Sequence, residues 1–332
     1  MRIGVLIPCY QPDDKLITLI DKLVSRQLSI IVVDDGSTKN TEIFDNLGCT
    51  VLHHNVNRGK GAALKTGFSY MMENGFDAAV TADSDGQHSP EDICNIINEM
   101  QNHPDTLVMG MRDVAQMPPK SKTGNDLTRK LFKIMYGIDL QDTQTGLRGI
   151  PLSEKLLELG GDRYEYEMEM LIHSKTLFKS VIEVPIETIY IDNNKSSHFN
   201  PVKDGLKIYS VLFSNLPSFM LVSVTSFVVD YLLFNLLYYF ILGSTTTSTI
   251  IARVVSSFTN FTLNKNFVFK NSGEKYNLFN YYKLAVFILV CNMTLMAVLV
   301  DVLGVPAFLA KIFVECGLYI VSYTTQNKWS KS

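Results

Sequence analysis

The sequence predicts two dissimilar parts: an α/β domain with a mostly parallel sheet over residues 1–200, and an all-α membrane domain over 215–332. In the first part, short apolar runs alternate with helical patterns, as in a sheet with helices on both faces. In the second part charged residues become rare, and Asp230 is the only one between Val211 and Ile250. Charged residues make up 19% of the 332-residue chain, below the roughly 25% of soluble proteins.

The elements of the first part follow one another in strand–helix order. Apolar runs predict strands at residues 3–7, 30–33, 50–53, 78–82 and 106–109. Helical spacing predicts helices at 13–27 and 61–74, and a third helix begins after Ser89 and Pro90, a serine N-cap followed by a proline at the first helical position. Because ligands of such sheets bind at the carboxyl ends of the strands, those ends are the expected place of a functional site.

A short charged segment connects the two parts. Over 201–214, lysines and apolar residues alternate at helical spacing, which predicts an amphipathic helix lying on the membrane surface. An ordinary packed surface helix would show the same pattern, so the prediction depends on the position of the segment just before the apolar part of the chain.

Four apolar stretches follow and predict four membrane-spanning helices. They cover about 216–242, 247–268, 281–302 and 305–326. Lysines gather in the connection 265–283 and in the tail, so the positive-inside rule predicts a multi-pass protein of the plasma membrane with this connection, the first domain and both termini in the cytoplasm. A weak internal repeat relates 261–270 to 323–331. Asp230 and Arg253 lie within apolar stretches, where charged residues usually face a partner or a cavity.

The composition excludes several classes of protein. A net charge of −3 gives no basic footprint for nucleic acid. The five cysteines have no C-x-x-C pair and an odd total, so the sequence predicts neither a disulfide framework nor a zinc site. Pro8 and the acidic residues after it come too early for the apolar core of a signal peptide, which predicts an N-terminus in the cytosol.

The segment ADSDGQH follows the strand predicted at 78–82 and contains a candidate metal site. If the backbone stays extended there, Asp83, Asp85 and Gln87 project to one side. Their oxygens are hard ligands suited to Mg²⁺ or Mn²⁺, in a site that leaves positions open for substrate phosphates. A solvated acidic turn is the alternative explanation. The spacing fits neither an EF-hand loop nor a GxxxxGK[ST] phosphate loop.

A second acidic pair, Asp34 and Asp35, closes the strand predicted at 30–33 and precedes a Gly-Ser-Thr turn. Carboxylates at this edge of the sheet could accept hydrogen bonds from a ribose or a base. A turn in which an aspartate accepts backbone hydrogen bonds explains the same pattern. The pair alone therefore does not decide between binding and turn formation.

Six motifs occur in the order seen in family 2 glycosyltransferases: IPCYQP (7–12), VVDDGST (32–38), NRGKGAALKTG (57–67), ADSDGQH (82–88), GMR (110–112) and DTQTGLRG (142–149). The chain resembles the branch of dolichol-phosphate mannose synthase and bacterial polyprenyl-phosphate glucosyltransferases. Its membrane part, with SFVVDYLLF (226–234) and ARVVSSFTNFTLNKNFVF (252–269), resembles the GtrA-like four-helix module. The resemblance implies a GT-A fold for the first part.

The resemblance also implies roles for individual residues. Those matching the nucleotide-sugar site are Pro8, Tyr10, Asp13, Asp35, Lys60, Asp83, Gln144, Ser197, His198 and Lys203. The metal site matches Asp83, Asp85 and Gln87. The cations expected at the acceptor phosphate are Arg112, Lys120, Lys122 and Arg129, the two lysines standing where related sequences often carry an arginine. The expected catalytic residues are Asp85, Arg112 and Asp142.

The function implied by the resemblance is the transfer of a hexose from a nucleotide sugar, of the UDP-glucose or GDP-mannose type, to a polyprenyl phosphate. The expected cofactor is Mg²⁺ or Mn²⁺, and the product is a lipid-linked sugar for glycosylation of the cell envelope. The acceptor phosphate, with a second pKa of roughly 6, is largely anionic at pH 7 and needs positioning more than deprotonation. In-line attack inverts the anomeric carbon. Assembly of identical chains is left open.

Two alternatives remain at this point. A processive polysaccharide synthase shares the motifs up to the D-x-D, but adds T-E-D and Q-x-x-R-W motifs. This sequence contains no T-E-D, and its only tryptophan, Trp329, lies in QNKWS after the last apolar stretch. The second alternative concerns the membrane module, which could translocate the glycosylated lipid instead of only anchoring the enzyme.

Overall fold

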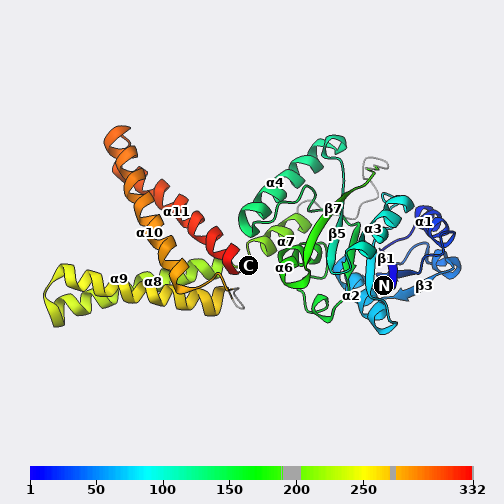
Figure 1. Cartoon of the computed structure of the whole chain (residues 1–332), viewed down its shortest axis with the longest axis horizontal. Helices are drawn as coiled ribbons and strands as arrows, with labels where there is room; N and C mark the ends of the chain where they lie inside the picture. The colour runs from blue at the N-terminus through cyan, green and yellow to red at the C-terminus, as the bar shows by residue number, and fades with distance from the viewer. Residues whose placement is uncertain (188, 190–202, 270–273, 331–332) are drawn as a thin grey trace. The chain divides into compact units, whose positions relative to one another are not determined.

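The structure of the protein is a computed structural model, and it describes residues 1–187, 189, 203–269 and 274–330 (Figure 1). Two compact units make up the chain: residues 1–133 with 138–212, and residues 134–137 with 213–332. The segment at 203–212, predicted as a separate interface helix, groups with the first unit. Ser197 and His198, predicted for the donor site, lie outside the described residues.

The first unit is built on a seven-stranded sheet with the strand order β3-β2-β1-β4-β6-β5-β7. The strands are β1 (Ile3–Cys9), β2 (Ile30–Asp34), β3 (Thr50–His53), β4 (Ala78–Thr81), β5 (Thr106–Met111), β6 (Arg148–Pro151) and β7 (Ser180–Pro185). Strand β6 runs antiparallel to β4 and β5, and the other neighbouring pairs are parallel. The predicted α/β domain with a mostly parallel sheet is confirmed.

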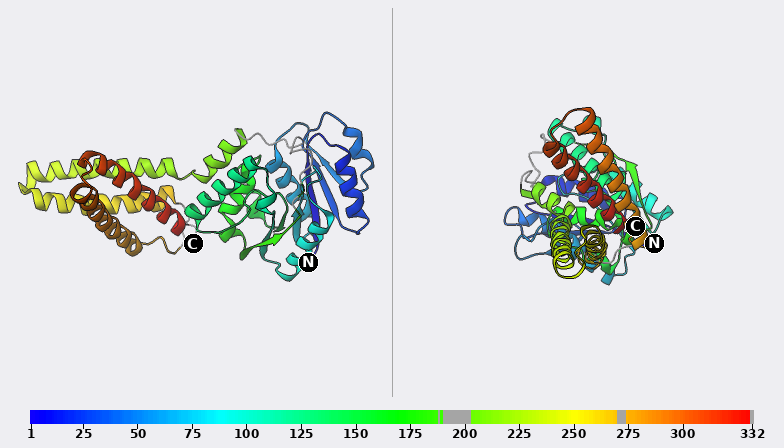
Figure 2. Two further views of the ribbon diagram at one scale, coloured as in Figure 1. Left: turned by 90° about the horizontal axis from the view of Figure 1, so that it is seen from above. Right: turned by 90° about the vertical axis from the view of Figure 1, so that its left-hand side faces the viewer.

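Helices cover both faces of this sheet (Figures 1 and 2). They include α1 (Asp14–Val24), α2 (Lys60–Glu73) and α3 (Pro90–Asn102). Val5 and Ile7 of β1 share one core with apolar residues of α1 and α3. Leu6 points to the other face, where Gly67 of α2 leaves room for it, because a Cβ on Gly67 would lie 2.2 Å from Leu6 Cδ1. Burial on both faces explains why β1 and β2 are continuous apolar runs.

The predicted strands and helices of this unit begin and end within a few residues of the observed ones. The helix caps act as expected: the Asp13 carboxylate accepts a hydrogen bond from a backbone N–H at the start of α1, and the Ser89 hydroxyl does the same for α3. Strands β6 and β7 are not predicted from the sequence, because β6 has Ile150 as its only large apolar residue and Glu183 interrupts the short apolar run of β7.

Further helices complete the first part of the chain. They are α4 (Pro119–Tyr136), α5 (Glu165–Ile172), α6 (Ser174–Leu177) and α7 (Lys203–Leu212), with 3-10 turns at Thr41–Asn46, Val114–Gln116 and Glu154–Leu156. Helix α7 has the predicted amphipathic pattern and packs against α5, burying Asp204, Ile208 and Leu212. Its contact with a membrane surface stays a prediction.

The second unit is helical. Its helices are α8 (Leu216–Leu236), α9 (Thr245–Leu263), α10 (Leu278–Ala297) and α11 (Ala307–Ser330), the first three continued by π-helical segments at Leu237–Leu242, Asn264–Val268 and Val298–Val302. Helix α8 pairs with α9 and α10 with α11, as two hairpins (Figures 1 and 2). Residues 216–241 and 278–302 are long and apolar enough to cross a membrane. That all four helices cross it stays a prediction.

Each hairpin contains polar side chains within its apolar length. In the first hairpin, Asp230 accepts a hydrogen bond from the Ser256 hydroxyl at 2.9 Å and lies 3.7 Å from the Arg253 guanidinium. In the second hairpin, the Asn292 amide donates to the Glu315 carboxylate at 3.0 Å. Asp230, Arg253 and Glu315, which the sequence places within apolar stretches, therefore have partners on the neighbouring helix, as is usual for ionisable residues in such stretches.

The internal repeat of the sequence corresponds to two buried asparagines. Asn264 and Asn327 occupy equivalent positions of the two repeats, and both are fully buried. The side chain of Asn215, at the start of α8, donates to Asn327 at 3.2 Å, and the Tyr276 hydroxyl donates to Gln326 at 2.7 Å. The first bond joins the two hairpins at the end where α8 begins and α11 finishes, and the second joins the connection before α10 to α11 at the same end.

Candidate active site

The carboxyl ends of β1, β2 and β4 border a cleft of about 480 Å³, and residues at the start of α2 and just before α5 complete its lining. Many of the residues predicted for the donor and metal sites line it: Pro8, Tyr10, Asp13, Asp35, Lys60, Asp83 and Asp85. Parallel strands bring their carboxyl ends to one edge of a sheet, which is why residues from distant motifs meet here.

Asp83 and Asp85 lie on a tight turn. Strand β4 ends at Thr81, Gly86 has a φ of +77°, and the Asp85 carboxylate accepts a hydrogen bond from the backbone N–H of Gln87 at 3.0 Å. The prediction that an extended backbone aligns the three metal-site residues is therefore wrong, because the chain turns as soon as the strand ends. Asp83 and Asp85 nevertheless line the same cleft.

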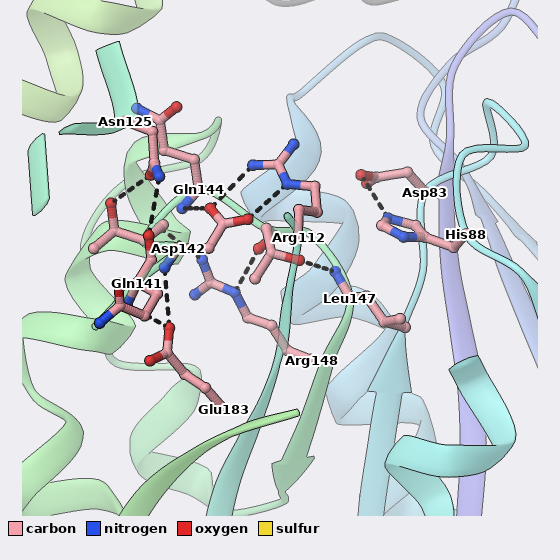
Figure 3. Close-up of polar contacts among 12 residues, drawn as sticks. Asp83, His88, Arg112, Asn125, Gln141, Asp142, Gln144, Leu147, Arg148 and Glu183 are labelled. Carbon is pink, nitrogen blue, oxygen red and sulfur yellow. Dashed lines mark hydrogen bonds and ion pairs between the residues drawn. The ribbon is translucent and has the colours of Figure 1, made fainter. Parts of the chain in front are cut away.

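Lys60 forms two ion pairs in this cleft. Its ammonium nitrogen lies 2.7 Å from Asp83 Oδ1 and 3.1 Å from Glu167 Oε1. The other carboxylate oxygen of Asp83 lies 3.2 Å from Nε2 of His88 (Figure 3). Burial raises the pKa of Asp83, but the charge of Lys60 and the hydrogen bond from His88 outweigh it and hold that pKa well below its usual range. Glu167 is not among the predicted residues; the acidic run at 164–167 is the signal that points to it.

Asp85 has a different environment from Asp83. Burial, followed by the negative charge of Asp83, raises the pKa of Asp85. The ring of Tyr164 lies 5.8 Å from the Lys60 ammonium, and burial raises the pKa of this tyrosine to about 12. Two carboxyl groups whose pKa values are pushed apart in one cleft are typical of a functional site.

Two glycines allow Lys60 to reach these acids. Gly59 precedes α2 with a φ of +105°, and a Cβ on it would lie 2.3 Å from the carbonyl oxygen of Asp162. A Cβ on Gly61 would lie 2.6 Å from Cβ of Tyr166. The first turn of α2 therefore packs directly against the start of α5, and this close approach holds Lys60 between its two carboxylate partners.

Asp35 holds the loop that leads into α2. One of its oxygens accepts a hydrogen bond from the N–H of Arg58 and lies near Nδ1 of His54, both at 2.8 Å, and the other accepts from the N–H of Gly59 at 2.6 Å. His54 is buried, and its Nε2 lies 2.9 Å from the Thr66 hydroxyl. The carboxylate thus has three protein partners, and its contact with a ribose or base stays a prediction.

Arg112 and Asp142 form a bidentate ion pair (Figure 3). Arg112 Nε and Nη2 lie 2.6 and 3.0 Å from the two oxygens of Asp142, whose side chain is fully buried. Gln144 donates its N–H to the same carboxylate at 3.0 Å. Glu183 of β7 accepts hydrogen bonds from the backbone N–H groups of Gln141 and Asp142. The structure brings the predicted residues Arg112, Asp142 and Gln144 together, and adds Glu183, which no sequence motif indicates.

Arg148 is buried, and it connects the group around Arg112 and Asp142 to the group around Lys60 and Glu167. Its guanidinium donates to the carbonyl oxygens of Thr145 and Glu167 at 2.9 and 2.8 Å, and to that of Thr143 at 3.4 Å. Burial lowers the pKa of Arg148, and nearby carboxylates, Glu167 first among them, counteract that effect. One cation therefore connects the loop that carries Asp142 to the helix that carries Glu167.

The other predicted acceptor cations lie on α4. Lys122 is exposed there, and Lys120 belongs to the same helix. Arg129 lies 3.8 Å from Asp139, an acid that also pairs with Lys133. Arg129 thus pairs with Asp139 and not with Asp142. Lys203, predicted for the donor site, is exposed at the beginning of α7.

The acidic pair has the oxygen donors that a hard divalent cation requires. Asp83 and Asp85 supply carboxylates to one cleft, and Gly146 leaves room for Asp83, since a Cβ on it would lie 2.4 Å from Asp83 Oδ2. Over the described residues, no three His, Cys, Asp or Glu side chains are grouped to hold a metal ion by themselves. Two carboxylates with open positions fit a metal site that the phosphates of a substrate complete.

The first unit has the fold of a GT-A glycosyltransferase. It is similar to the crystal structure of glucosyl-3-phosphoglycerate synthase from Mycobacterium tuberculosis in complex with Mn²⁺, UDP-glucose and phosphoglyceric acid, with a TM-score of 0.51 and 20% sequence identity. The similarity covers 64% of this chain and 79% of that protein. At this identity the likeness concerns the fold alone.

Sequence comparison gives the family. Residues 4–151 match the glycosyl transferase family 2, and residues 218–331 match the GtrA/DPMS transmembrane domain. The UDP-N-acetylglucosamine–dolichyl-phosphate N-acetylglucosaminyltransferase of Methanococcus voltae is 32% identical over 62% of this chain and 93% of that protein. The undecaprenyl-phosphate mannosyltransferase of Micrococcus luteus is 29% identical over 56% and 83%. The chain therefore belongs to the family 2 glycosyltransferases, as its motifs predict, and it is an enzyme with a membrane domain.

Asp35→Asn tests whether this residue holds the loop before α2. An asparagine would turn an amide N–H toward the N–H of Arg58 or Gly59, and an unsatisfied buried donor costs about 1–3 kcal/mol. We expect the Tm of the nucleotide-free protein in detergent to fall, by roughly 2–4 °C per kcal/mol. Asp13→Asn is the matched control, because asparagine is an equally good N-cap. An unchanged Tm with lost nucleotide affinity would instead show direct contact with the donor.

Proposed function

We propose that this enzyme transfers a hexose from a nucleotide sugar to a polyprenyl phosphate and so makes a lipid-linked sugar. The observation that carries the proposal is the presence, in one chain, of the cleft around Asp83, Asp85 and Lys60 and of a GtrA/DPMS-type membrane domain. The names of relatives that act on dolichyl and undecaprenyl phosphate support a lipid acceptor. They also favour a single transfer over processive polysaccharide synthesis.

The cleft suits a nucleoside diphosphate sugar. Pro8 and Tyr10 at the end of β1 offer a surface for the base, and Asp13 adds a carboxylate at the same end. The first turn of α2 contributes the positive end of the helix dipole together with Lys60, and both attract a diphosphate. The similar synthase from Mycobacterium tuberculosis holds UDP-glucose, which supports a donor of this class.

Asp83 and Asp85 are the proposed metal ligands, with Gln87 as a further candidate beside them. A bound Mg²⁺ or Mn²⁺ would neutralise the negative charge that develops on the departing nucleoside diphosphate. The carboxylate donor set and the Mn²⁺ in the similar synthase support this assignment. Lys60 supplies positive charge to the same side of the cleft.

The acceptor phosphate needs placement, because its oxygens are already largely anionic near pH 7. Arg112 is the proposed cation for it, held in orientation by the fork of hydrogen bonds to Asp142, whose backbone is fixed in turn by Glu183. A phosphate oxygen attacks the anomeric carbon opposite the diphosphate, so one C–O bond forms while the other breaks and the configuration inverts. An α-linked nucleotide sugar then gives a β-linked lipid phosphate.

The membrane domain is proposed to cross the bilayer four times, with the cleft and both termini in the cytoplasm. The lysines of the connection 265–283 and of the tail support this orientation. The domain then keeps the enzyme beside a lipid acceptor. Because Asp230 and Arg253 pair with each other, anchoring accounts for both charges, and we favour it over lipid translocation.

A donor screen combined with Asp85→Ala tests the proposed reaction. Membranes containing the enzyme, a polyprenyl phosphate and a series of nucleotide sugars should give a lipid-linked product with Mg²⁺ or Mn²⁺, measured by thin-layer chromatography of labelled lipid. We expect Asp85→Ala to lose about 100-fold or more of the rate, since it removes stabilisation of developing charge. Asp162→Ala, at an exposed acid outside the cleft, should keep its activity. Full activity of Asp85→Ala in excess chelator would rule out the metal site.

Arg112→Lys tests the acceptor contact while keeping a positive charge next to Asp142. Loss of the bidentate fork should lower the acceptor-dependent kcat/KM about tenfold, equivalent to about 1.4 kcal/mol, with nucleotide affinity and Tm unchanged. Arg26→Lys makes the same change at an exposed position outside the cleft. Equal losses in both variants, or a parallel loss of nucleotide affinity at Arg112, would contradict a specific phosphate contact by Arg112.

Cysteine labelling tests the proposed topology. In a cysteine-free background, Lys275→Cys should react with an impermeant maleimide from the cytoplasmic face, and Ser244→Cys from the opposite face. The two positions lie in connections at opposite ends of the hairpins. Labelling of Ser244→Cys from the cytoplasm would show that the first two helices do not both cross the membrane.

A further inference from the structure

The Lys60 ammonium lies next to the Asp83 carboxylate, where the proposed metal ion would otherwise bind. Its ammonium nitrogen is 2.7 Å from Asp83 Oδ1, and Nε2 of His88 is 3.2 Å from Asp83 Oδ2, so both oxygens of the carboxylate face a nitrogen. The Lys60 side chain is 14% exposed, which means that water screens this ion pair only weakly. A metal ion that uses Asp83 must share the carboxylate with these groups.

The Lys60 ammonium already lies between two carboxylates before any substrate binds. Glu167, with a side chain 10% exposed, holds the other side of the ammonium at 3.1 Å. A divalent cation added at Asp83 would place two like charges a few ångströms apart at a site that is poorly screened. A nucleoside diphosphate entering the same cleft would offer the ammonium another anionic partner in place of Asp83 and so relieve that repulsion.

We propose that Lys60 makes the binding of the divalent cation and of the nucleoside diphosphate mutually dependent. Without the diphosphate, Lys60 competes with the metal ion for Asp83. With the diphosphate bound, the ammonium turns to the phosphate oxygens and leaves Asp83 to the metal ion. Coupling between two ligands is reciprocal, so the metal ion tightens diphosphate binding by the same factor. This inference rests on the proposed role of Asp83 and Asp85 as metal ligands.

The position of Lys60 allows both states. It lies in the first turn of α2 and lines the same cleft as Asp83, Asp85 and Tyr164, so a diphosphate bound there is within reach of its flexible four-carbon side chain. Within the described residues, Asp83 and Asp85 are not joined by a third His, Cys, Asp or Glu side chain in a group that could hold a metal ion. A metal ion arriving alone therefore meets few ligands and one competing ammonium.

Binding of Mn²⁺ tests this inference without any measurement of catalysis. The EPR signal of free Mn²⁺ is followed during titration of the full-length protein in detergent, alone and with UDP or GDP, and corrected for Mn²⁺ bound by the nucleotide in a protein-free blank. We expect the nucleotide to tighten Mn²⁺ binding by wild type about tenfold or more. In Lys60→Gln, Mn²⁺ alone should bind about tenfold more tightly than in wild type, and the enhancement by nucleotide should shrink correspondingly.

Lys65→Gln is the matched control. Lys65 lies on the same helix, its ammonium is 3.3 Å from the exposed Asp162, and its loss changes the net charge by the same amount. It should behave as wild type, whereas Lys60→Met should behave as Lys60→Gln and serves in its place if the glutamine variant is unstable. Lys60→Arg keeps the positive charge and should keep the weak binding of Mn²⁺ alone.

Two failures can be told apart. If nucleotide promotes Mn²⁺ binding in wild type, but Lys60→Gln binds Mn²⁺ alone no more tightly than wild type or Lys65→Gln, the inference about Lys60 is wrong and the metal site stands. If none of these proteins binds Mn²⁺ even with UDP or GDP, and lipid glycosylation continues in chelator, the proposed metal site itself is wrong and the inference fails with it.

Discussion

The buried guanidinium of Arg148 is the contact on which the geometry of the site depends. Arg148 is the first residue of β6, the antiparallel strand between β4 and β5. Its guanidinium donates hydrogen bonds to the loop at 143–145 and to the backbone of Glu167 on α5. A buried charge without such partners is strongly unfavourable. Separation of the loop from the helix would therefore leave the guanidinium exposed or without hydrogen-bond partners. The residues proposed to hold donor and acceptor are thereby kept in one rigid frame.

Within that frame the anchors proposed for the two substrates lie on different elements. The donor side uses the ends of β1 and β4 and the first turn of α2, where Lys60 and Asp83 meet. The acceptor side uses Arg112 at the end of β5 and the buried Asp142, with Glu183 on the adjacent strand β7. Because the strands deliver both sets to one edge of the sheet, the proposed donor and acceptor sites lie side by side, as an in-line transfer requires.

How much of this could be predicted from the sequence depends on whether a feature is local. The caps at Asp13 and Ser89, the apolar strands and the residues lining the cleft follow from local patterns and motifs, and the structure agrees with them. The sequence predicts an extended backbone at Asp83–Asp85, but the structure has a turn there. The end of a strand depends on its pairing with neighbouring strands, which the local sequence does not show. The acidic run at 164–167 marks Glu167 but not its partner Lys60, and Glu183 carries no local signal, because in both cases the partners lie far along the chain.

The order of the elements along the chain also determines the order in which the protein can be built. Strand β1 lies inside the sheet yet comes first, and β7, the last strand of the sheet along the chain, ends at Pro185, before α8 begins at Leu216. Domains generally fold as units during synthesis, N-terminal first. The ribosome therefore delivers a complete catalytic sheet before it presents the first strongly apolar helix to the insertion machinery, so folding of the enzyme and its entry into the bilayer are successive events that do not compete for the same residues.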